Sequence, residues 1–299
     1  MSTAVTVDAP AKVNLALQVG PLRPDGYHDV TTVMLTVGLA DTLVAASGEK
    51  GITLERDPEP DFPAQRDLVV RAVSELAAAT GREATLALSL EKRIPIAAGL
   101  GGGSADAAAA LVACCALWGL DPGAPVVLSV AGALGADVPF MLRGGCALYT
   151  GRGDVPVAEL ETPDLDIVLT NAGFAVPTAD VYRAFDALGA PSVTDARAAA
   201  EGVATGGRGA ILAALANDLT GAARQVAPAI GEVLDALAAR PGVLGALLAG
   251  SGGTVFGIAR DAEAASAAAA ALAARGWWAV ATSTRGPRDG DQPARLRVY

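Results

Sequence analysis

The chain has 299 residues, 52% of them hydrophobic, and a formal net charge of −10 at pH 7. This length suggests one large domain or two of ordinary size, with enough apolar side chains for a sizeable core. The acidic balance argues against general binding to nucleic acid. Any phosphorylated ligand must therefore be met by local donors rather than by a basic surface.

Cysteine content and hydropathy indicate the compartment. Cys114, Cys115 and Cys146 lack the spacing of metal ligands, which predicts buried free thiols in a reducing cytoplasm. No basic segment followed by an apolar run begins the chain, so no signal peptide is predicted. The longest apolar run, residues 107–120, is too short to cross a bilayer. We therefore expect a cytoplasmic protein without a membrane-spanning segment.

The first 55 residues are predicted to be rich in β-strands. Apolar and polar residues alternate, or apolar residues cluster, in three segments: 13–19, 30–37 and 41–46. A turn-rich loop that contains Tyr27 and His28 separates the first two of these strands. Asp67 then stands where it can cap a helix that ends at Gly81.

A glycine loop follows, and it is the most informative stretch of the chain. Residues 84–90 alternate like a half-buried strand, and the segment from Ser104 to residue 118 is rich in Ala and Leu, as in a helix. Between them, four glycines fall within residues 99–103. Ser104 is predicted to cap the helix, with Asp106 in its first turn. The free N–H groups of such a helix N-terminus offer a site for an anion, most simply a phosphate.

Three other interpretations of this loop can be compared with its sequence. It can be a tight turn between a strand and a helix. A Walker A loop requires Gly-Lys-Ser/Thr, and no lysine occurs here. A dinucleotide fingerprint fails at its last glycine, where Ser104 stands, although Asp121 lies at a distance suitable for a ribose-binding acid.

The remaining elements are predicted from periodicity and from turn residues. A helix at 124–134 and a strand at 147–149 precede a Gly- and Pro-rich segment at 151–161, where we place a boundary between domains 1–157 and 158–299. In the second half we predict strands at 165–170, 245–249, 254–259 and 277–283, and helices from 178, within 195–239 and at 261–274. Mixed strands and helices of this kind indicate an α+β fold.

The motifs together resemble the GHMP kinase superfamily. Residues 95–104 fit its phosphate-binding loop, Pro-x-x-x-Gly-Leu-Gly-x-x-Ser, and Asn217-Asp218-Leu219 matches a further motif. Matching stretches run in the family's order, at 10–15, 23–28, 95–109, 135–140 and 250–256. Arg-x-Asp-Gly-Tyr-His at 23–28 indicates the branch that phosphorylates a methylerythritol linked to cytidine diphosphate, in the non-mevalonate route to isoprenoid precursors. The resemblance implies a ribosomal-protein-S5-like N-terminal domain and a ferredoxin-like C-terminal domain.

The resemblance also implies roles for individual residues. Asp137 would accept the proton of the attacking 2-hydroxyl, and Lys12 would stabilise the developing alkoxide. ATP, with Mg²⁺, would bind to Pro95, Ile96, Ala97, Ala98, Gly99, Leu100, Gly101, Gly102, Gly103, Ser104 and Ala105, with Lys92 close by. Ser104 is also a candidate contact for the metal. The small-molecule substrate would bind to Asn14, Tyr27, His28, Tyr182, Gly250, Ser251 and Gly252, its cytosine stacked on the aromatic rings.

The chain departs from the family's pattern at a few positions. Asp67 stands where an Asn is frequent, Ala249 where a Ser is usual, and residues 171–173 lack the usual proline.

Three competing hypotheses remain. The chain could be a GHMP kinase for homoserine or a mevalonate derivative, a nicotinamide-dependent dehydrogenase, or a binding protein that has lost catalysis.

Overall fold

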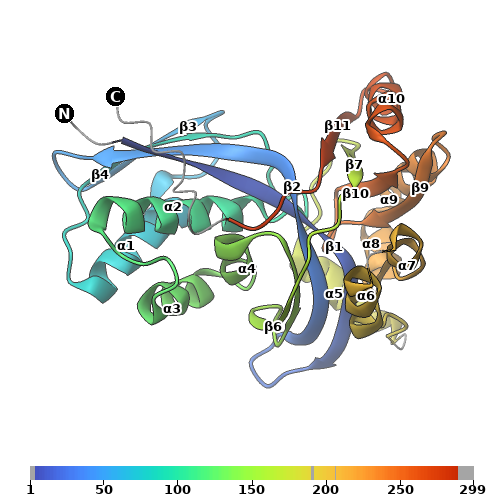
Figure 1. The fold of residues 1–299 in the computed structure, drawn as a ribbon, viewed down its shortest axis with the longest axis horizontal. Coiled ribbons are helices and arrows are strands. Elements are labelled where there is room, and N and C mark those ends of the chain that lie inside the picture. Colours follow the sequence, from blue (N-terminus) through green and yellow to red (C-terminus); the bar gives the residue numbers. More distant parts are fainter. Residues whose placement is uncertain (1–3, 190–191, 206, 289–299) are drawn as a thin grey trace.

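The structure is a computed structural model that describes residues 4–189, 192–205 and 207–288. Within these ranges the strands form two sheets, one of seven strands and one of four, and helices accompany both (Figure 1). The predicted α+β class is therefore confirmed.

Two long antiparallel strands form the centre of the seven-stranded sheet. They are β1 (Ala4–Leu22) and β2 (His28–Ser47). The sheet order is β3-β4-β2-β1-β8, and β5 pairs with β2 and β6. The added strands are β3 (Ile52–Asp57), β4 (Leu86–Glu91), β5 (Cys146–Thr150), β6 (Val155–Leu160) and β8 (Ala216–Asn217).

The two strands predicted at 30–37 and 41–46 are in fact one. The register of the β1–β2 pair shifts between Pro10 and Lys12, and again between Asn14 and Ala16. Irregularities of this kind let a strand bend and twist without ending. As a result β2 continues through Gly38 and serves two neighbours, β5 early in its length and β4 late.

Four helices lie on one side of this sheet (Figure 1). They are α1 (Leu68–Thr80), α2 (Gly102–Trp118), α3 (Pro125–Leu134) and α4 (Val138–Arg143). The Asp67 side chain accepts a hydrogen bond from Val69 N and caps α1, and Gly81 ends α1 with a φ of 65°, as predicted. Helix α2 is apolar nearly all round and lies buried, since its small alanines allow close packing.

The second half contributes the four-stranded sheet, with all its pairs antiparallel and the order β11-β7-β10-β9. Its strands are β7 (Asp166–Asn171), β9 (Val243–Leu248), β10 (Val255–Ala259) and β11 (Trp278–Ser283). Its helices are α5 (Thr178–Leu188), α6 (Ala196–Ala204), α7 (Arg208–Ala213), α8 (Thr220–Val226), α9 (Ala229–Ala238) and α10 (Ala262–Ala273). The strands and helices predicted for this half are confirmed. A short 3₁₀ turn, η1 (Ala64–Arg66), precedes α1.

The two halves share both backbone pairing and core. Strand β8, from the second half, pairs with β1, and the predicted boundary between residues 157 and 158 falls inside β6, which pairs with β5. One buried cluster contains Val13 and Leu15 of the first sheet together with Leu169 and Phe256 of the second. The division into domains 1–157 and 158–299 stays a prediction.

Two further observations bear on the expectations from composition. The three cysteines are free and buried, as predicted. Within the described ranges, no helix has the length and apolar character needed to cross a bilayer.

Candidate active site

A large cavity of about 930 Å³ lies where the glycine loop, the β1–β2 hairpin and α5 meet. Its volume is at the upper end of the range of about 300–1,000 Å³ that is usual for small-molecule sites. Segments far apart in the sequence supply its wall, among them the loops before α4, between β5 and β6, and between β9 and β10.

The glycine loop forms the floor of an anion site at the start of α2. Gly101, with a φ of 70°, is the residue that precedes the helix, and no side chain caps it. The prediction that Ser104 caps α2 is therefore wrong, because the residue in the cap position is Gly101, three residues earlier. The first helical N–H that is bonded belongs to Ala105, which donates to Gly101 O at 2.9 Å. The N–H groups of residues 102–104 are thus left for a ligand.

Close packing explains the glycines in this loop. A Cβ on Gly99 would stand 2.4 Å from Ala249 O, and one on Gly101 would stand 2.5 Å from Met141 Cε. Both residues also have positive φ angles. Ala97 has a φ of 54°, a conformation that costs an ordinary residue about 1–2 kcal/mol. The loop is thus held in a conformation that the surrounding structure imposes.

Lys12 and Asp137 form an ion pair on the wall of the cavity. The ammonium of Lys12 lies 3.5 Å from the Asp137 carboxylate, and only 6% of the lysine side chain is exposed, against 33% for the aspartate. The backbone N–H of Lys12 donates to Leu100 O, which joins strand β1 to the glycine loop. Asp137 immediately precedes α4, with Gly135 before it and a proline in the first turn.

A chain of buried hydrogen bonds fixes the position of Lys12. Its Nζ donates to Asn14 Oδ1 at 2.9 Å, Asn14 Nδ2 donates to Thr32 Oγ1 at 2.8 Å, and Thr32 donates to Ala16 O at 2.7 Å. The amide of Asn14 is therefore engaged on both sides, and its orientation is determined. No role was predicted for Thr32, since nothing in a β-strand threonine indicates such a partner.

Lys92 sits behind the glycine loop in a cluster with two carboxylates. Its ammonium contacts Asp41 and lies 2.6 Å from Asp106 Oδ2. Asp41 also accepts the backbone N–H groups of Arg93 and Ile94, so it is fully engaged. Burial raises the pKa of Asp106 to about 8, an effect that outweighs the lowering by Lys92. Lys92 lines the cavity, but its charge is already compensated.

An aromatic group forms the opposite end of the cavity. The rings of His28 and Tyr182 stack with their centroids 5.4 Å apart. Burial, together with the negative charge of Asp137, raises the pKa of the Tyr182 hydroxyl to about 12. His28 Nδ1 lies 2.9 Å from Gly20 O, so it carries the proton, since a carbonyl only accepts. Nε2 of His28 lies 3.1 Å from Asp186 but is not aligned for a hydrogen bond.

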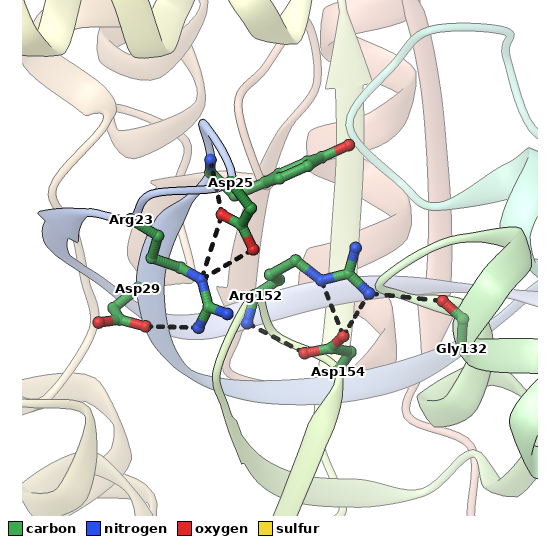
Figure 2. A network of polar contacts seen from close by, with 7 residues as sticks. Arg23, Asp25, Asp29, Gly132, Arg152 and Asp154 are labelled. Atoms are coloured by element: carbon green, nitrogen blue, oxygen red, sulfur yellow. Dashed lines mark hydrogen bonds and ion pairs between the residues drawn. The ribbon is translucent and has the colours of Figure 1, made fainter.

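A charged network surrounds the tip of the β1–β2 hairpin (Figure 2). Arg23 contacts Asp25 and Asp29, while Arg152, from the loop between β5 and β6, contacts Asp154. The contacts of Arg23 hold the turn that presents Tyr27, whose side chain is 57% exposed. Asp25 also accepts the N–H of Tyr27, and this bond lowers its pKa.

The loop between β9 and β10 completes the wall. Thr254 N donates to Ala98 O in the glycine loop, and the hydroxyl groups of Ser251 and Thr178 are 2.8 Å apart. Asn217 Nδ2 donates to the carbonyl groups of Leu248 and Gly250. The Asn-Asp-Leu motif therefore holds this loop in place through the side-chain hydrogen bonds of Asn217.

The cavity brings together nearly all of the residues singled out in the sequence. Two do not reach its wall, Ala105 and Gly252. Ala105 is fully buried in the core, and its N–H is used inside α2. Gly252 donates its N–H to Ala249 O within its own turn. Asp106, Arg152 and Asp186 also line the cavity, although no site role was predicted for them. The sequence Gly-Arg-Gly-Asp at residues 151–154 is a local signal that could have indicated Arg152.

Comparison with known proteins agrees with this geometry. Residues 67–145 match the family model described as GHMP kinases N terminal domain, and residues 197–276 match that described as GHMP kinases C terminal. The homoserine kinase from Cytophaga hutchinsonii superposes with a TM-score of 0.73 over 97% of each chain at 19% identity, and so shares the fold. The chain has the fold of the GHMP kinases, which are small-molecule kinases.

Relatives of higher identity define the branch. The 4-diphosphocytidyl-2-C-methyl-D-erythritol kinase of Streptomyces coelicolor is 42% identical in an alignment 281 residues long, which covers 91% of this chain and 93% of the relative. A crystal structure of 4-(cytidine 5'-diphospho)-2C-methyl-D-erythritol kinase superposes with a TM-score of 0.77 at 36% identity, over 94% of this chain and 99% of that one. The chain belongs to the family of 4-diphosphocytidyl-2-C-methyl-D-erythritol kinases.

Proposed function

We propose that this enzyme transfers the γ-phosphoryl group of ATP to the 2-hydroxyl of 4-diphosphocytidyl-2-C-methyl-D-erythritol, a step in isoprenoid precursor biosynthesis. The observation that carries the proposal is the meeting of two groups in one cavity: the free N–H groups at the start of α2 and the Lys12–Asp137 pair. Positioning and charge stabilisation are what phosphoryl transfer requires from a protein. We also place the enzyme in the cytoplasm, where its three free thiols would stay reduced.

Asp137 acts as the general base in this proposal. Its carboxylate is a third exposed and so can reach a substrate hydroxyl, whereas the ammonium of Lys12 is held behind it. As the hydroxyl proton moves to Asp137, the oxygen becomes negative and attacks the γ-phosphorus, and the ADP oxygen leaves. Lys12 lies where it can stabilise the charge on the attacking oxygen without moving, because Asn14 fixes it.

The glycine loop fits the triphosphate of ATP. A ligand that presents anionic oxygens finds three backbone donors there, and the glycines leave room for a close approach. The described residues contain no group of three or more His, Cys, Asp or Glu side chains arranged to hold a metal ion. In kinases, phosphate oxygens and water supply most of the ligands of Mg²⁺, and a site of that kind fits these residues. Ser104 is the candidate protein ligand. Mg²⁺ would offset the negative charge of the phosphates.

The aromatic end of the cavity suits the cytosine of the substrate. Tyr27 offers an exposed ring, and His28 offers a polar edge beside Tyr182. Stacking on an aromatic side chain contributes about 1–3 kcal/mol per base. Gly250 lies near Lys12, since a Cβ at Gly250 would stand 3.4 Å from Lys12 Nζ. The loop that contains Gly250 therefore bounds the part of the cavity proposed for the substrate hydroxyl.

The test is ATP consumption by the purified enzyme with 4-diphosphocytidyl-2-C-methyl-D-erythritol and Mg²⁺. We expect turnover by the wild type and a fall in kcat of at least about 100-fold for Asp137→Asn, with the KM for ATP within about threefold, because a general base contributes about 10²–10⁴-fold. Asp235→Asn, at a surface position, is the control and should behave as the wild type. Turnover with homoserine or mevalonate, and none with the cytidine compound, would contradict the proposal.

A further inference from the structure

Arg152 lies on the cavity wall, and the roles proposed above do not use it. Its guanidinium carbon stands 5.4 Å from the centroid of the Tyr27 ring. Nε and Nη2 donate to Asp154 Oδ2 at 2.9 and 2.6 Å, and Nη2 also reaches Gly132 O at 3.5 Å, as Figure 2 shows. The side chain is 31% exposed. Nη1 makes no hydrogen bond to any other residue in the described part of the chain, so it stays available to a ligand.

The backbone around Arg152 is also held in place. Val30 N donates to Gly151 O at 2.6 Å, and Val30 forms a parallel bridge with Arg152. The Arg152 N–H donates to Asp154 Oδ1. A guanidinium fixed by an aromatic ring, a carboxylate and a paired backbone has lost most of its freedom before any ligand arrives. The entropic cost of using it is therefore small.

The position of Arg152 lies between the two ends of the proposed substrate site. On one side is Tyr27, at the end proposed for the cytosine. On the other side is the end of α3, after which the chain continues to Asp137. A nucleoside diphosphate ester must cross this space with two negative charges. Lys12 and Lys92, on the same wall, are paired with Asp137 and Asp106. The wall also includes Arg56 and Arg183, which are paired with Asp67 and Asp180, and Arg66 on the turn before α1. In a protein of net charge −10, such charges need a local cation.

We propose that Arg152 is a substrate-selecting residue whose guanidinium binds the diphosphate of the acceptor. It selects an acceptor linked through a diphosphate over an unphosphorylated cytidine compound. Its contact with Tyr27 couples recognition of the cytosine to recognition of the diphosphate. This inference rests on the proposed function.

Calorimetric titration with two probes, CDP and cytidine, tests it. We expect the wild type to bind CDP more tightly than cytidine. Arg152→Gln should raise the Kd for CDP by about tenfold or more and change the Kd for cytidine by less than about threefold. The reason is that a hydrogen bond to a charged group contributes about 1.5–3 kcal/mol. Arg152→Lys keeps the charge and should recover part of the loss. In steady-state assays the KM for the acceptor should rise, with kcat and the KM for ATP close to wild type.

A matched control is present in the same chain. Arg275 lies 4.0 Å from the centroid of Trp277 and pairs with Glu232, away from the cavity, so Arg275→Gln removes a similar arrangement without an effect on CDP. Equal weakening of CDP and cytidine in Arg152→Gln would overturn the inference, because Arg152 would then act only through Tyr27. A wild type that turns over the substrate but binds CDP no better than cytidine would overturn it as well. A wild type that binds neither probe and phosphorylates no cytidine compound would overturn the proposed function itself.

Discussion

At the scale of single residues, the site depends on charges whose partners are already in place. Lys12 is buried and is oriented by Asn14, which is in turn held by Thr32. Because these groups need not reorganise when the substrate hydroxyl becomes negative, their stabilisation is available at once. Asn14, predicted as a substrate contact, also has this supporting position, and its role toward the substrate stays a prediction.

Removal of the Thr32 hydroxyl should weaken catalysis without any change at the nucleotide site. Thr32→Val keeps the shape of the side chain but removes the acceptor of Asn14 Nδ2 and one donor to Ala16 O. We expect kcat to fall by about three- to tenfold and the free energy of unfolding by about 1–3 kcal/mol, the cost of a buried unpaired polar group. Steady-state kinetics and urea unfolding measure the two effects. A normal kcat together with an increased KM for ATP would contradict this account. Thr32→Ser should restore activity.

The cluster of Lys92, Asp41 and Asp106 predicts a pH-dependent stability. The pKa of Asp106 is about 8 in the folded protein, against about 3.9 when unfolded. The folded state therefore holds an extra proton, and its stabilising contribution is complete below about pH 4 and is lost as the pH rises through about 8. We expect the wild type to lose up to about 1.4 kcal/mol per pH unit relative to Asp106→Asn between pH 6 and 8. Urea unfolding at several pH values measures this, with Asp235→Asn as control, and parallel curves for wild type and Asp106→Asn would contradict it.

At the scale of elements, the glycine loop acts as a junction. It joins β4 to α2, accepts the N–H of Lys12 on β1, and accepts the N–H of Thr254 from the loop after β9. The nucleotide site, the proposed base and the second sheet are thus coupled through backbone atoms. A change in the loop's conformation would displace all three.

Gly99 is the position where this coupling can be tested. In Gly99→Ala the new Cβ would stand 2.4 Å from Ala249 O and 2.7 Å from Gly252 O, on a residue with a φ of 79°. Since backbone atoms cannot yield cheaply, we expect a loss of at least about 1–3 kcal/mol in unfolding free energy and an increased KM for ATP. Gly132→Ala, inside α3 with nothing within 4 Å, should instead be neutral or slightly stabilising. Differential scanning calorimetry compares the two, and equal melting temperatures would contradict the clash.

At the scale of the whole molecule, the two sheets behave as parts of one structure. Leu169 and Phe256 share a core with Val13 and Leu15, and β8 crosses to the first sheet. Beyond β11 the chain also returns to the first sheet, where the Thr36 hydroxyl donates to Arg285 O at 2.6 Å. Few contacts of this kind would be present if each half folded alone.

We therefore expect unfolding in one cooperative transition. Near-ultraviolet and far-ultraviolet circular dichroism should give the same midpoint in urea, because the shared core cannot open in one half only. Thr36→Val, which removes the bond to Arg285, should lower the midpoint for both probes together. Two separated transitions would contradict this expectation and would favour independent domains.

Much of the fold and of the site could be predicted from the sequence because the signals are local. The Asp67 cap, the end of α1 at Gly81 and the strands of the second half follow from residues close together in the chain. The spelling of residues 95–104, together with the turn around Tyr27, indicated the family. Neither depends on where distant segments lie.

Other features were decided only by tertiary structure. The continuity of β2 depends on pairing with β1, β4 and β5, and the helix start at Gly102 depends on packing of the glycine loop against the loop after β9. Lys92 is compensated by Asp41, and Arg152 lies against Tyr27, in each case across a long stretch of chain. Contacts of this kind have no local signal, because the free energy that places them comes from burial and pairing between segments that meet only in the folded molecule.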